Sequence, residues 1–378
     1  RILPMAAQKI KNGVFRSDLT LSDGRTIRYY DSIEIERGAI DKRPSDVAPQ
    51  LGELRLDPLV NEWTIVAAHR TKRVFYPPKE LCPLCPTDKN AEVNRLTEIP
   101  ESDYEVVSFD NRHPALADPN RDWALPDLAG PDTDSHTAAG HCEVICFTSE
   151  HEKSFKDLDA GHLNTLITAW ADRTAELSEK PFVEYVGLFE NRGQEVGVTL
   201  HHPHSQIYAY SFLPPRLEKM YVTAKKYYEQ TGKVLMNEII KREMAEQKRI
   251  VFENEFWVAF VPYAAKYPFE IQVAPKQSVA DLSKLNEEQL NSWPEIASTI
   301  MKKLDGVYGV SMPYIAAWYQ APVKRGGDIM KLHWQINSVR ATPEKLKYLA
   351  GSESAMGAFV ADQTPEHSAE TLRSVKIN

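Results

Sequence analysis

The sequence has few cysteines and no long hydrophobic run, and both shortages limit what the chain can be. Only four of its 378 residues are cysteines, Cys82, Cys85, Cys142 and Cys146, and nothing near Arg1 resembles a secretory signal. A chain of this length without such a signal is expected to keep its thiols reduced, so we predict a cytoplasmic protein with a candidate metal site rather than a disulfide framework. No uncharged apolar stretch reaches about 18 residues, which excludes a membrane-spanning helix.

The chain also lacks an excess of positive charge. Lys and Arg number 45 against 53 Asp and Glu, which gives a formal net charge of −8. A broad nucleic-acid surface needs a positive stripe that neutralises phosphates, so nucleic acid is not expected as a partner. The balance still allows a few local arginines to hold a small phosphorylated ligand. Hydrophobic residues make up 42% and charged residues 26%, as in an ordinary globular protein long enough for two domains.

Hydrophobic patterns predict strands and helices joined by links of hairpin length. A helix is predicted over residues 157–179, where apolar side chains recur at helical spacing, and a long charged helix over 217–246. This mixture favours the α+β class over a doubly wound parallel sheet. The strands are predicted at residues 104–111, 140–150, 182–191, 201–210, 249–260, 269–276, 313–319 and 331–340.

Both halves of the chain end in a strand that carries a histidine followed two positions later by glutamine. The first strand contains His204 and Gln206, and the second contains His333 and Gln335. This repetition indicates an internal duplication with its boundary near residues 214–218. We therefore predict two domains, an N-terminal catalytic domain over residues 1–215 and a C-terminal domain over residues 216–378.

The stretch "LHHPHSQIYAY" (residues 200–210) concentrates three of the 11 histidines of the chain around Pro203. On a strand, alternate side chains share a face, so His202, His204 and Gln206 are expected to point the same way. Because a proline cannot donate to a sheet ladder, we expect this strand to lie at a sheet edge or to begin at an exposed position. The alternative interpretation is a polar strand face whose histidines are merely hydrogen-bonded.

An imidazole at position 204 has three candidate roles: metal ligand, proton shuttle, or nucleophile toward phosphorus. Gln206 favours the last role, because an amide transfers no proton but donates hydrogen bonds to phosphoryl oxygens that gain charge. The leaving group must then depart readily as an anion, as a sugar 1-phosphate does. Transfer to a second phosphate is then nearly thermoneutral and needs little acid catalysis.

The segment "HPHSQIYAYSFLP" is similar to the active-site motif of the galactose-1-phosphate uridylyltransferases, a branch of the histidine-triad superfamily. Further matches follow the family order from about Leu54 to Asp362, among them "DPLVNEWTIVAAHRTKR", "SFDNRHPAL", "FENRGQEVGVT" and "VPYAAKYPFEIQVAPK". The resemblance implies two histidine-triad-like domains, the second with a degenerate motif, built on a mainly antiparallel, half-barrel-like sheet flanked by helices. Ser205 stands where relatives often have glycine, and it should be tolerated because it faces away from the site.

The resemblance also implies the reaction of the family. UMP passes from UDP-glucose to galactose 1-phosphate in a ping-pong cycle, through a covalent uridylyl group on His204. The products are glucose 1-phosphate and UDP-galactose.

Cys82-Pro-Leu-Cys85 has the spacing with which two thiolates hold one tetrahedral ion, although half a site could equally be two buried thiols. The resemblance adds His151 and His202 to complete a Cys2His2 set. It implies one structural Zn²⁺ per chain, which would also fix the position of His204, two residues beyond a ligand.

Two other groups are not expected to bind metal. Some relatives use a glutamate and three histidines of the second half for a second ion, and the corresponding positions here are taken to be Tyr319, Asn337 and Val339. These side chains cannot replace three imidazoles, so no second metal is predicted. Cys142 and Cys146 lie in a strong β pattern and are expected in the core.

The substrate contacts are also assigned by the resemblance. "HRTKR" offers Arg70 and Arg73 to the nucleotide phosphates, reached across the interface of a homodimer, although the run could equally be a solvated basic turn. The remaining contacts are Asn111, Arg112 and His113 for uracil and ribose, Asn191, Gly197 and Thr199 for the phosphates, and Lys347 and Glu353 for the hexose.

Two alternative functions remain open at this point. One is a phosphorylase of the same superfamily that acts on ADP-sugars or dinucleoside polyphosphates with inorganic phosphate as acceptor. The base contacts at residues 111–113 and the region of Lys347 and Glu353 would distinguish it. The other is a non-catalytic, zinc-stabilised nucleotide-binding protein, which would have no need to keep His204 together with Gln206.

Overall fold

The computed structural model describes residues 6–45, 51–72, 77–87, 96–119 and 135–377. The strands are β1 Gln8–Lys9, β2 Phe15–Thr20, β3 Thr26–Asp31, β4 Glu53–Asp57, β5 Glu62–Val66, β6 Val106–Asp110, β7 His136–Thr137, β8 Gly140–Cys146, β9 Tyr185–Arg192, β10 His204–Tyr210, β11 Ile250–Glu253, β12 Trp257–Phe260, β13 Phe269–Pro275, β14 Tyr314–Tyr319 and β15 His333–Ser338. The helices are α1 Ala160–Ser178, α2 Pro215–Thr231, α3 Leu235–Glu246, α4 Glu287–Gly306, α5 Gly351–Met356 and α6 Pro365–Ser374.

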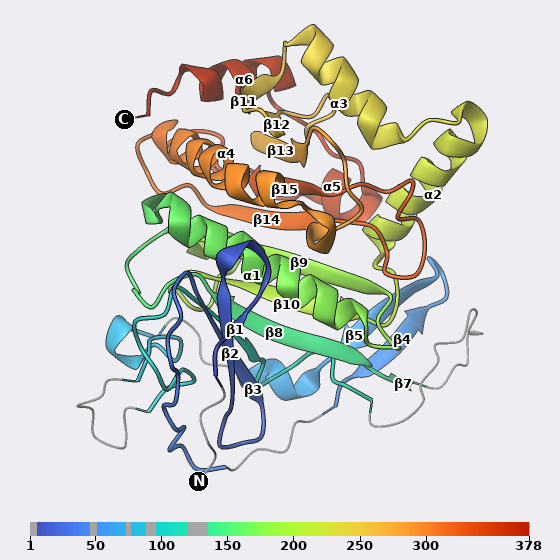
Figure 1. Cartoon of the computed structure of the whole chain (residues 1–378). Coiled ribbons are helices and arrows are strands. Elements are labelled where there is room, and N and C mark those ends of the chain that lie inside the picture. The colour runs from blue at the N-terminus through green and yellow to red at the C-terminus, as the bar shows by residue number, and fades with distance from the viewer. Residues whose placement is uncertain (1–5, 46–50, 73–76, 88–95, 120–134, 378) are drawn as a thin grey trace.

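One large antiparallel sheet runs through both halves of the chain. Its twelve strands follow the order β1-β2-β3-β6-β8-β10-β9-β14-β15-β13-β12-β11, and β5-β4-β7 form a small separate sheet (Figure 1). The two ends of the large sheet do not pair with each other, so it stays open instead of closing into a barrel. The predicted α+β class with a mainly antiparallel sheet is therefore confirmed.

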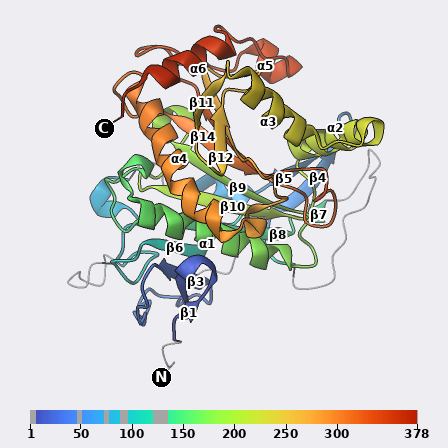
Figure 2. The same ribbon diagram turned by 45° about the horizontal axis from the view of Figure 1, so that its top comes forward.

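Helices cover the two faces of this sheet unequally. α1 and α4 lie side by side across one face, one from each half of the chain (Figures 1 and 2). On the opposite face, α3 packs through Ile240 on Val258 and Phe260 of β12. Between these covered regions, the central strands β10, β9 and β14 keep partly exposed side chains, and this open region contains His204.

The core under α1 and α4 is built largely from tryptophan. Trp170 of α1, Trp293 of α4, Trp318 of β14 and Trp334 of β15 are all buried and contact one another with ring centroids 5.5–6.1 Å apart. Such aromatic pairs contribute about 0.5–1.5 kcal/mol each beyond the burial of their area. This cluster joins the two halves, so they share one core as well as one sheet.

Two helix predictions need correction. The single helix predicted over 217–246 is wrong: Gly232 adopts the left-handed conformation with φ +68° and ends α2, and α3 starts three residues later. The helical pattern of residues 286–304 contains Pro294, which is a candidate helix breaker, yet α4 continues through it. Its N-terminus is fixed by Asn286 and Gln289, each of which bonds the backbone N–H of the other, and the loss of one internal bond at Pro294 is tolerated in this buried helix.

Of the two positions expected for the histidine strand, the sheet edge is wrong, whereas the strand does begin at partly exposed residues, Pro203 and His204. β10 lies in the middle of the sheet, paired with β8 on one side and β9 on the other. Pro203 immediately precedes the first residue of β10, so its missing N–H interrupts no ladder bond, and its carbonyl accepts the backbone N–H of Phe147 at 3.1 Å.

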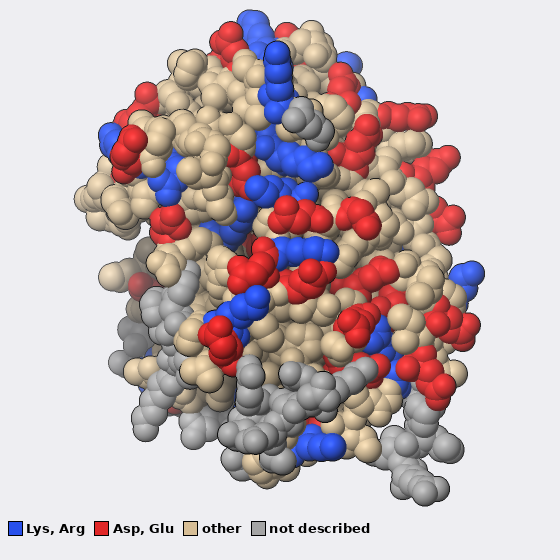
Figure 3. All heavy atoms as spheres, turned by 90° about the vertical axis from the view of Figure 1, so that its left-hand side faces the viewer, with Lys and Arg blue, Asp and Glu red and all other residues tan. Residues whose placement is uncertain are grey.

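Charges on the described surface are mixed in sign. On the face shown in Figure 3, lysine and arginine side chains alternate with aspartate and glutamate, without a broad positive area. Among the helices that the structure describes, none combines the length and the apolar character needed to cross a membrane.

Candidate active site and metal centre

Side chains along β10 alternate between a partly exposed face and a buried face. His204 and Gln206 are partly exposed on the open side of the sheet, whereas Ser205 and Ile207 are fully buried toward α1. The Ser205 hydroxyl accepts a hydrogen bond from Nε1 of Trp170 at 3.1 Å. The prediction that Ser205 faces away from the site is therefore confirmed, and the hydroxyl satisfies a buried tryptophan N–H.

The ring of His204 is held in one tautomer by the backbone. Its Nδ1 lies 2.7 Å from the carbonyl oxygen of His202. A carbonyl only accepts hydrogen bonds, so Nδ1 carries the proton and Nε2 keeps its lone pair. This arrangement leaves His204 with a nucleophilic nitrogen on the same strand face as the Gln206 amide.

The four predicted metal ligands converge. One ligand atom from each of Cys82, Cys85, His151 and His202 lies within 4.8 Å of all the others. The Cys85 sulfur is 3.3 Å from Nδ1 of His151 and 3.6 Å from Nδ1 of His202. Ligand atoms around tetrahedral zinc lie about 3.3–3.8 Å apart, because Zn–N bonds are about 2.0–2.1 Å and Zn–S bonds about 2.3 Å. The set thus fits one small tetrahedral ion.

The protonation of this set also suits a metal. A hydrogen bond from the Cys85 thiol lowers the pKa of Cys82, while the same shared proton raises the pKa of Cys85. Nε2 of His202 donates to the backbone carbonyl of Thr148 at 2.7 Å, which turns the Nδ1 lone pair toward the sulfurs. Sequence reasoning missed Thr148, because a backbone carbonyl leaves no residue-type signal.

A second cluster of potential metal ligands, two carboxylates and a histidine, does not resemble a metal site. Asp110, His141 and Glu143 have ligand atoms within 4.8 Å of one another, but arginines already neutralise the carboxylates. Arg173 donates to both Glu143 oxygens at 2.9 and 2.7 Å, and Arg28 to Asp110 at 3.0 Å. We assign this cluster to structure, as a buried ion-pair network between β3, β6, β8 and α1.

The predicted base contacts lie at the end of β6, on the same face of the sheet as His204. The backbone N–H of Asn111 donates to the carbonyl of Cys142, which pairs with Tyr208 of β10. Two strand spacings, about 9–10 Å, thus separate Asn111 from β10. Asn111 and Arg112 line a cavity of about 300 Å³.

The cations near this cavity are only partly engaged. Arg112 forms an ion pair with Glu98 at 3.6 Å. Arg70 lies in a short 3-10 helix, Ala68–Lys72, and its Nε is buried without a hydrogen-bond partner among the described residues. His113 adjoins them, and its backbone N–H donates to the Asn111 side chain at 2.8 Å. Arg73 lies outside the described residues.

The glycine-containing loop over residues 193–199 joins β9 to β10. Asn191 is one residue beyond Glu190, the partner of Ser205 across the β9–β10 ladder, so it lies at the level of His204. Gly197 has φ +80°, a backbone conformation that other residues rarely adopt, and Thr199 follows it partly exposed. The loop therefore reaches the end of the sheet from which β10 begins.

Lys347 and Glu353, the predicted hexose contacts, form an ion pair with each other at 3.3 Å. No contact that the structure describes joins them directly to His204. The segment before Lys347 is linked to the glycine loop through Arg340, which donates to Glu195 at 2.9 Å.

The three positions considered for a second metal do not meet at one point. Tyr319 lies opposite His333 in the β14–β15 ladder, whereas Asn337 lies opposite Ile315. Four residues along a strand correspond to about 13 Å. Val339 lies beyond the end of β15, and the absence of a second metal stays a prediction.

Comparison with known proteins gives one family for the whole chain. A sequence model of the "Galactose-1-phosphate uridyl transferase, N-terminal domain" matches residues 45–214, and one of the C-terminal domain matches residues 221–378. Galactose-1-phosphate uridylyltransferase of Streptomyces lividans is 38% identical over 81% of this chain and 81% of its own length. The enzyme of Thermotoga maritima is 35% identical over 86% of this chain and 99% of its own length.

A solved uridylyltransferase structure gives the same result in three dimensions. It superposes with a TM-score of 0.74 and 31% sequence identity, and covers 85% of this chain and 98% of the solved chain. The chain belongs to the galactose-1-phosphate uridylyltransferase family.

Proposed function

We propose that this protein transfers UMP from UDP-glucose to galactose 1-phosphate, with His204 as the nucleophile. One observation carries the assignment of the nucleophile: the His204 ring donates through Nδ1 to the His202 carbonyl, on the same strand face as the Gln206 amide. The curated relatives at 31–38% identity, all named galactose-1-phosphate uridylyltransferase, support the choice of substrates.

The transfer takes place in two displacements at the α-phosphorus. Nε2 of His204 attacks this phosphorus, the bond to the bridging oxygen breaks, and glucose 1-phosphate leaves with the electron pair. A phosphate oxygen of galactose 1-phosphate then attacks the same phosphorus, which breaks the P–N bond and frees His204. In both steps the Gln206 amide is placed to donate to phosphoryl oxygens as they gain charge. No external acid is needed, because both leaving groups are good ones.

The Cys82, Cys85, His151 and His202 set would hold one Zn²⁺. Its donor atoms and their separation suit zinc, and the ion would act structurally by tethering His202. Because His202 offers its side chain to the metal set and its carbonyl to His204, a tether on His202 also orients the nucleophile.

The other predicted contacts complete the proposed site. Asn111, Arg112 and His113 would receive uracil and ribose, and Asn191, Gly197 and Thr199 the phosphates. Lys347 and Glu353 would bind the hexose, and Arg70 and Arg73 would reach the phosphates from a second copy in a homodimer. The division into domains at residues 215/216 likewise remains part of the proposal.

The two alternatives are less well supported. The relatives that match most of the chain are named galactose-1-phosphate uridylyltransferase, which favours transfer to a sugar phosphate over a phosphorylase reaction. A pure binding protein gives no reason for a nucleophilic histidine held in one tautomer beside an amide donor.

Isotope exchange tests this function directly. With UDP-glucose and labelled glucose 1-phosphate, but without galactose 1-phosphate, the double displacement predicts label in UDP-glucose. A His204→Asn variant should lose the exchange, and a His333→Asn variant serves as the matched control. Exchange that requires galactose 1-phosphate would contradict a ping-pong cycle, and exchange with ADP-glucose alone would contradict the uridylyl assignment.

A further inference from the structure

A second cavity, of about 560 Å³, lies in the C-terminal half on the same sheet face as His204. Its floor includes His333 and Gln335 of β15. Trp334 and Ile336, which alternate with them, face the core with α4, so His333 and Gln335 face away from it. Cavities of this size commonly hold small organic ligands.

The positive charges around this cavity are not neutralised by carboxylates. Arg216, Lys219, Lys266 and Lys331 all line it, and none of the four forms an ion pair within the part of the chain that the structure describes. Arg216 donates to the Tyr319 hydroxyl at 3.2 Å, which is a neutral group.

The one carboxylate that lines the cavity already accepts hydrogen bonds from neighbouring groups. Glu270 accepts hydrogen bonds from the backbone N–H groups of Lys266 and Tyr267 at 2.6 and 3.3 Å, and from the Gln335 amide at 3.1 Å. Burial, together with the charge of Arg216, lowers the pKa of Lys266 even though Glu270 raises it. The cavity thus has four cations facing one engaged carboxylate, a balance that favours an anion.

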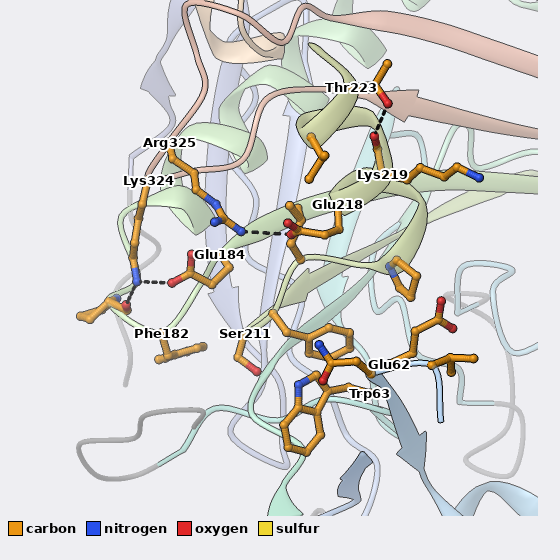
Figure 4. A pocket seen from close by; sticks show the side chains of 17 residues that line it. Glu62, Trp63, Phe182, Glu184, Ser211, Glu218, Lys219, Thr223, Lys324 and Arg325 are labelled. Carbon is orange, nitrogen blue, oxygen red and sulfur yellow. Dashed lines mark hydrogen bonds and ion pairs between the residues drawn. The ribbon is translucent and has the colours of Figure 1, made fainter. Parts of the chain in front are cut away.

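A larger cavity nearby contains cations that do form ion pairs. It has a volume of about 900 Å³ and is also lined by cations, among them Lys324 and Arg325. Lys324 pairs with Glu184 at 2.8 Å and Arg325 with Glu218 at 3.2 Å, and both pairs are drawn as dashed lines in Figure 4. Lys219 lines both cavities, but Arg216, Lys266 and Lys331 line only the C-terminal one, so three cations without an ion pair distinguish it from the larger cavity.

The histidine of this cavity is oriented like the proposed nucleophile. Nδ1 of His333 lies 3.5 Å from the carbonyl of Lys331, two residues earlier, as Nδ1 of His204 lies near the carbonyl two residues before it. Burial lowers the pKa of His333 to about 4, so the ring is neutral near pH 7. A neutral ring and an amide, Gln335, add polar contacts without adding charge.

The remaining wall of the cavity is apolar. It includes Met220, Met236 and Ile239 from α2 and α3, together with Phe359. The ammonium of Lys266 lies 5.0 Å from the centre of the Phe359 ring. An aromatic ring beside a cation suits a flat organic group attached to an anion.

We propose that this cavity is a second ligand site, which binds a nucleoside monophosphate. The phosphate would contact Lys266 and Lys331, with Arg216 and Lys219 adding positive charge, and the base would lie against Phe359 and the methionines. This inference does not depend on uridylyl transfer at His204.

Hydrogen exchange of the whole protein with and without UMP tests the proposal. UMP should slow exchange in residues 215–223, 262–270 and 329–335, separately from any effect on the segment around His204. Lys266→Ala/Lys331→Ala should weaken the UMP affinity measured from this protection by about tenfold or more, since it removes two charge-assisted contacts. Lys225→Ala/Lys226→Ala removes the same charge from the exposed side of α2 and should leave that affinity within about twofold.

Three results would overturn the proposal. The first is protection confined to β9 and β10, and the second is equal protection in the Lys266/Lys331 variant. The third is a response to inorganic phosphate as strong as the response to UMP, because the apolar wall would then have no role. Lys331→Ala alone gives the same test, with a smaller loss, should the double variant fold poorly.

Discussion

β10 and β15 carry the same His-x-Gln pattern in the same sheet, yet their surroundings differ. Gln206 pairs with Phe189, Phe189 with Ala317, and Ala317 with Gln335, so the two glutamines lie in one transverse row. The histidines lie on opposite sides of this row, because successive strands alternate in direction. The two halves of the chain therefore place the same His-x-Gln pattern in nearly symmetric backbone positions.

The differences begin one or two residues away from each motif. Position 202 before the first motif is a histidine whose side chain joins the metal set, whereas position 331 before the second is a lysine. His204 is partly exposed with a 2.7 Å contact to its backbone carbonyl, and His333 is 4% exposed with a 3.5 Å contact. The sheet thus aligns both histidines, and we expect neighbouring residues to decide which imidazole reacts.

The largest expected effect separates the two histidines. His204→Asn should lower kcat/KM for UMP transfer by at least about 10⁴-fold, because it removes the atom that bonds to phosphorus. His333→Asn should stay within about threefold of the unchanged protein. Steady-state assays of both variants check this, and equal losses would show that the two strands act as one site.

The second prediction concerns the proposed metal tether on His202, two residues before β10. Cys85→Ala should lower the free energy of unfolding by about 4 kcal/mol or more and abolish stoichiometric zinc, because it breaks the Cys2His2 set. Cys142→Ala removes a buried thiol outside that set and should cost about 1–2 kcal/mol with zinc retained. Denaturant titration with metal analysis measures both quantities, and retained zinc in the Cys85 variant would disprove the assigned ligands.

The glutamines provide a third contrast. Gln206→Ala should reduce kcat by about 10²–10³-fold, the usual cost of losing one donor to a developing charge. Gln335→Ala should leave kcat nearly unchanged, since its amide bonds Glu270 instead. The prediction is measured as kcat at saturating substrate. A higher KM with an unchanged kcat would instead mean that Gln206 binds the ground state and the transition state equally.

The pH dependence of stability should differ in sign between the halves. Burial alone would lower the pKa of His141, but hydrogen bonds to Asp110 and Glu143 outweigh this effect. The net result is a pKa raised to about 9. Its stabilisation is present below pH 6.5 and is lost between pH 6.5 and 9. His333, with a pKa lowered by burial to about 4, contributes above pH 6.5 and loses its contribution as the pH falls to 4.

Each of these contributions is on the order of 3 kcal/mol. His141→Gln should therefore flatten the alkaline limb of the stability profile, and His333→Gln the acid limb. Thermal unfolding from pH 4 to 9 measures both limbs. Profiles that remain unchanged would show that these histidines keep their ordinary pKa values.

The smallest effect tests the buried face of β10. Ser205→Ala leaves Nε1 of Trp170 without its acceptor, so the free energy of unfolding should fall by about 1–2 kcal/mol, with kcat/KM retained. Ser205→Thr keeps an acceptor oxygen and serves as the control for the alanine variant. A large loss of activity in the alanine variant would mean that the core side of the strand also sets the position of His204.

Much of the site could be predicted from sequence, because its residues are close together or share a motif. The alternation of His204 and Gln206 specifies one face of a strand, and the Cys82–Cys85 spacing specifies half of a metal site. The family resemblance supplied His151 and His202, and the structure brings all four ligands together.

Other features could not be predicted, because they depend on the backbone or on distant packing. The carbonyls of Thr148 and His202, which orient two imidazoles, have no signature in the residue type. The central position of β10 depends on strands far away in sequence, so Pro203 gave a misleading indication of an edge. The charged cavity over β15 gathers Arg216, Lys266 and Lys331 from three separate segments.

The covalent intermediate tests the central claim most directly. The protein is mixed with UDP-glucose, quenched under alkaline denaturing conditions that preserve P–N bonds, and mapped by peptide mass spectrometry. The account predicts one uridylyl group per chain on the peptide that contains His204, with none on the peptide of His333 and none in His204→Asn. A uridylyl group on any other residue, or glucose 1-phosphate released in stoichiometric amount without a covalent adduct, would contradict it.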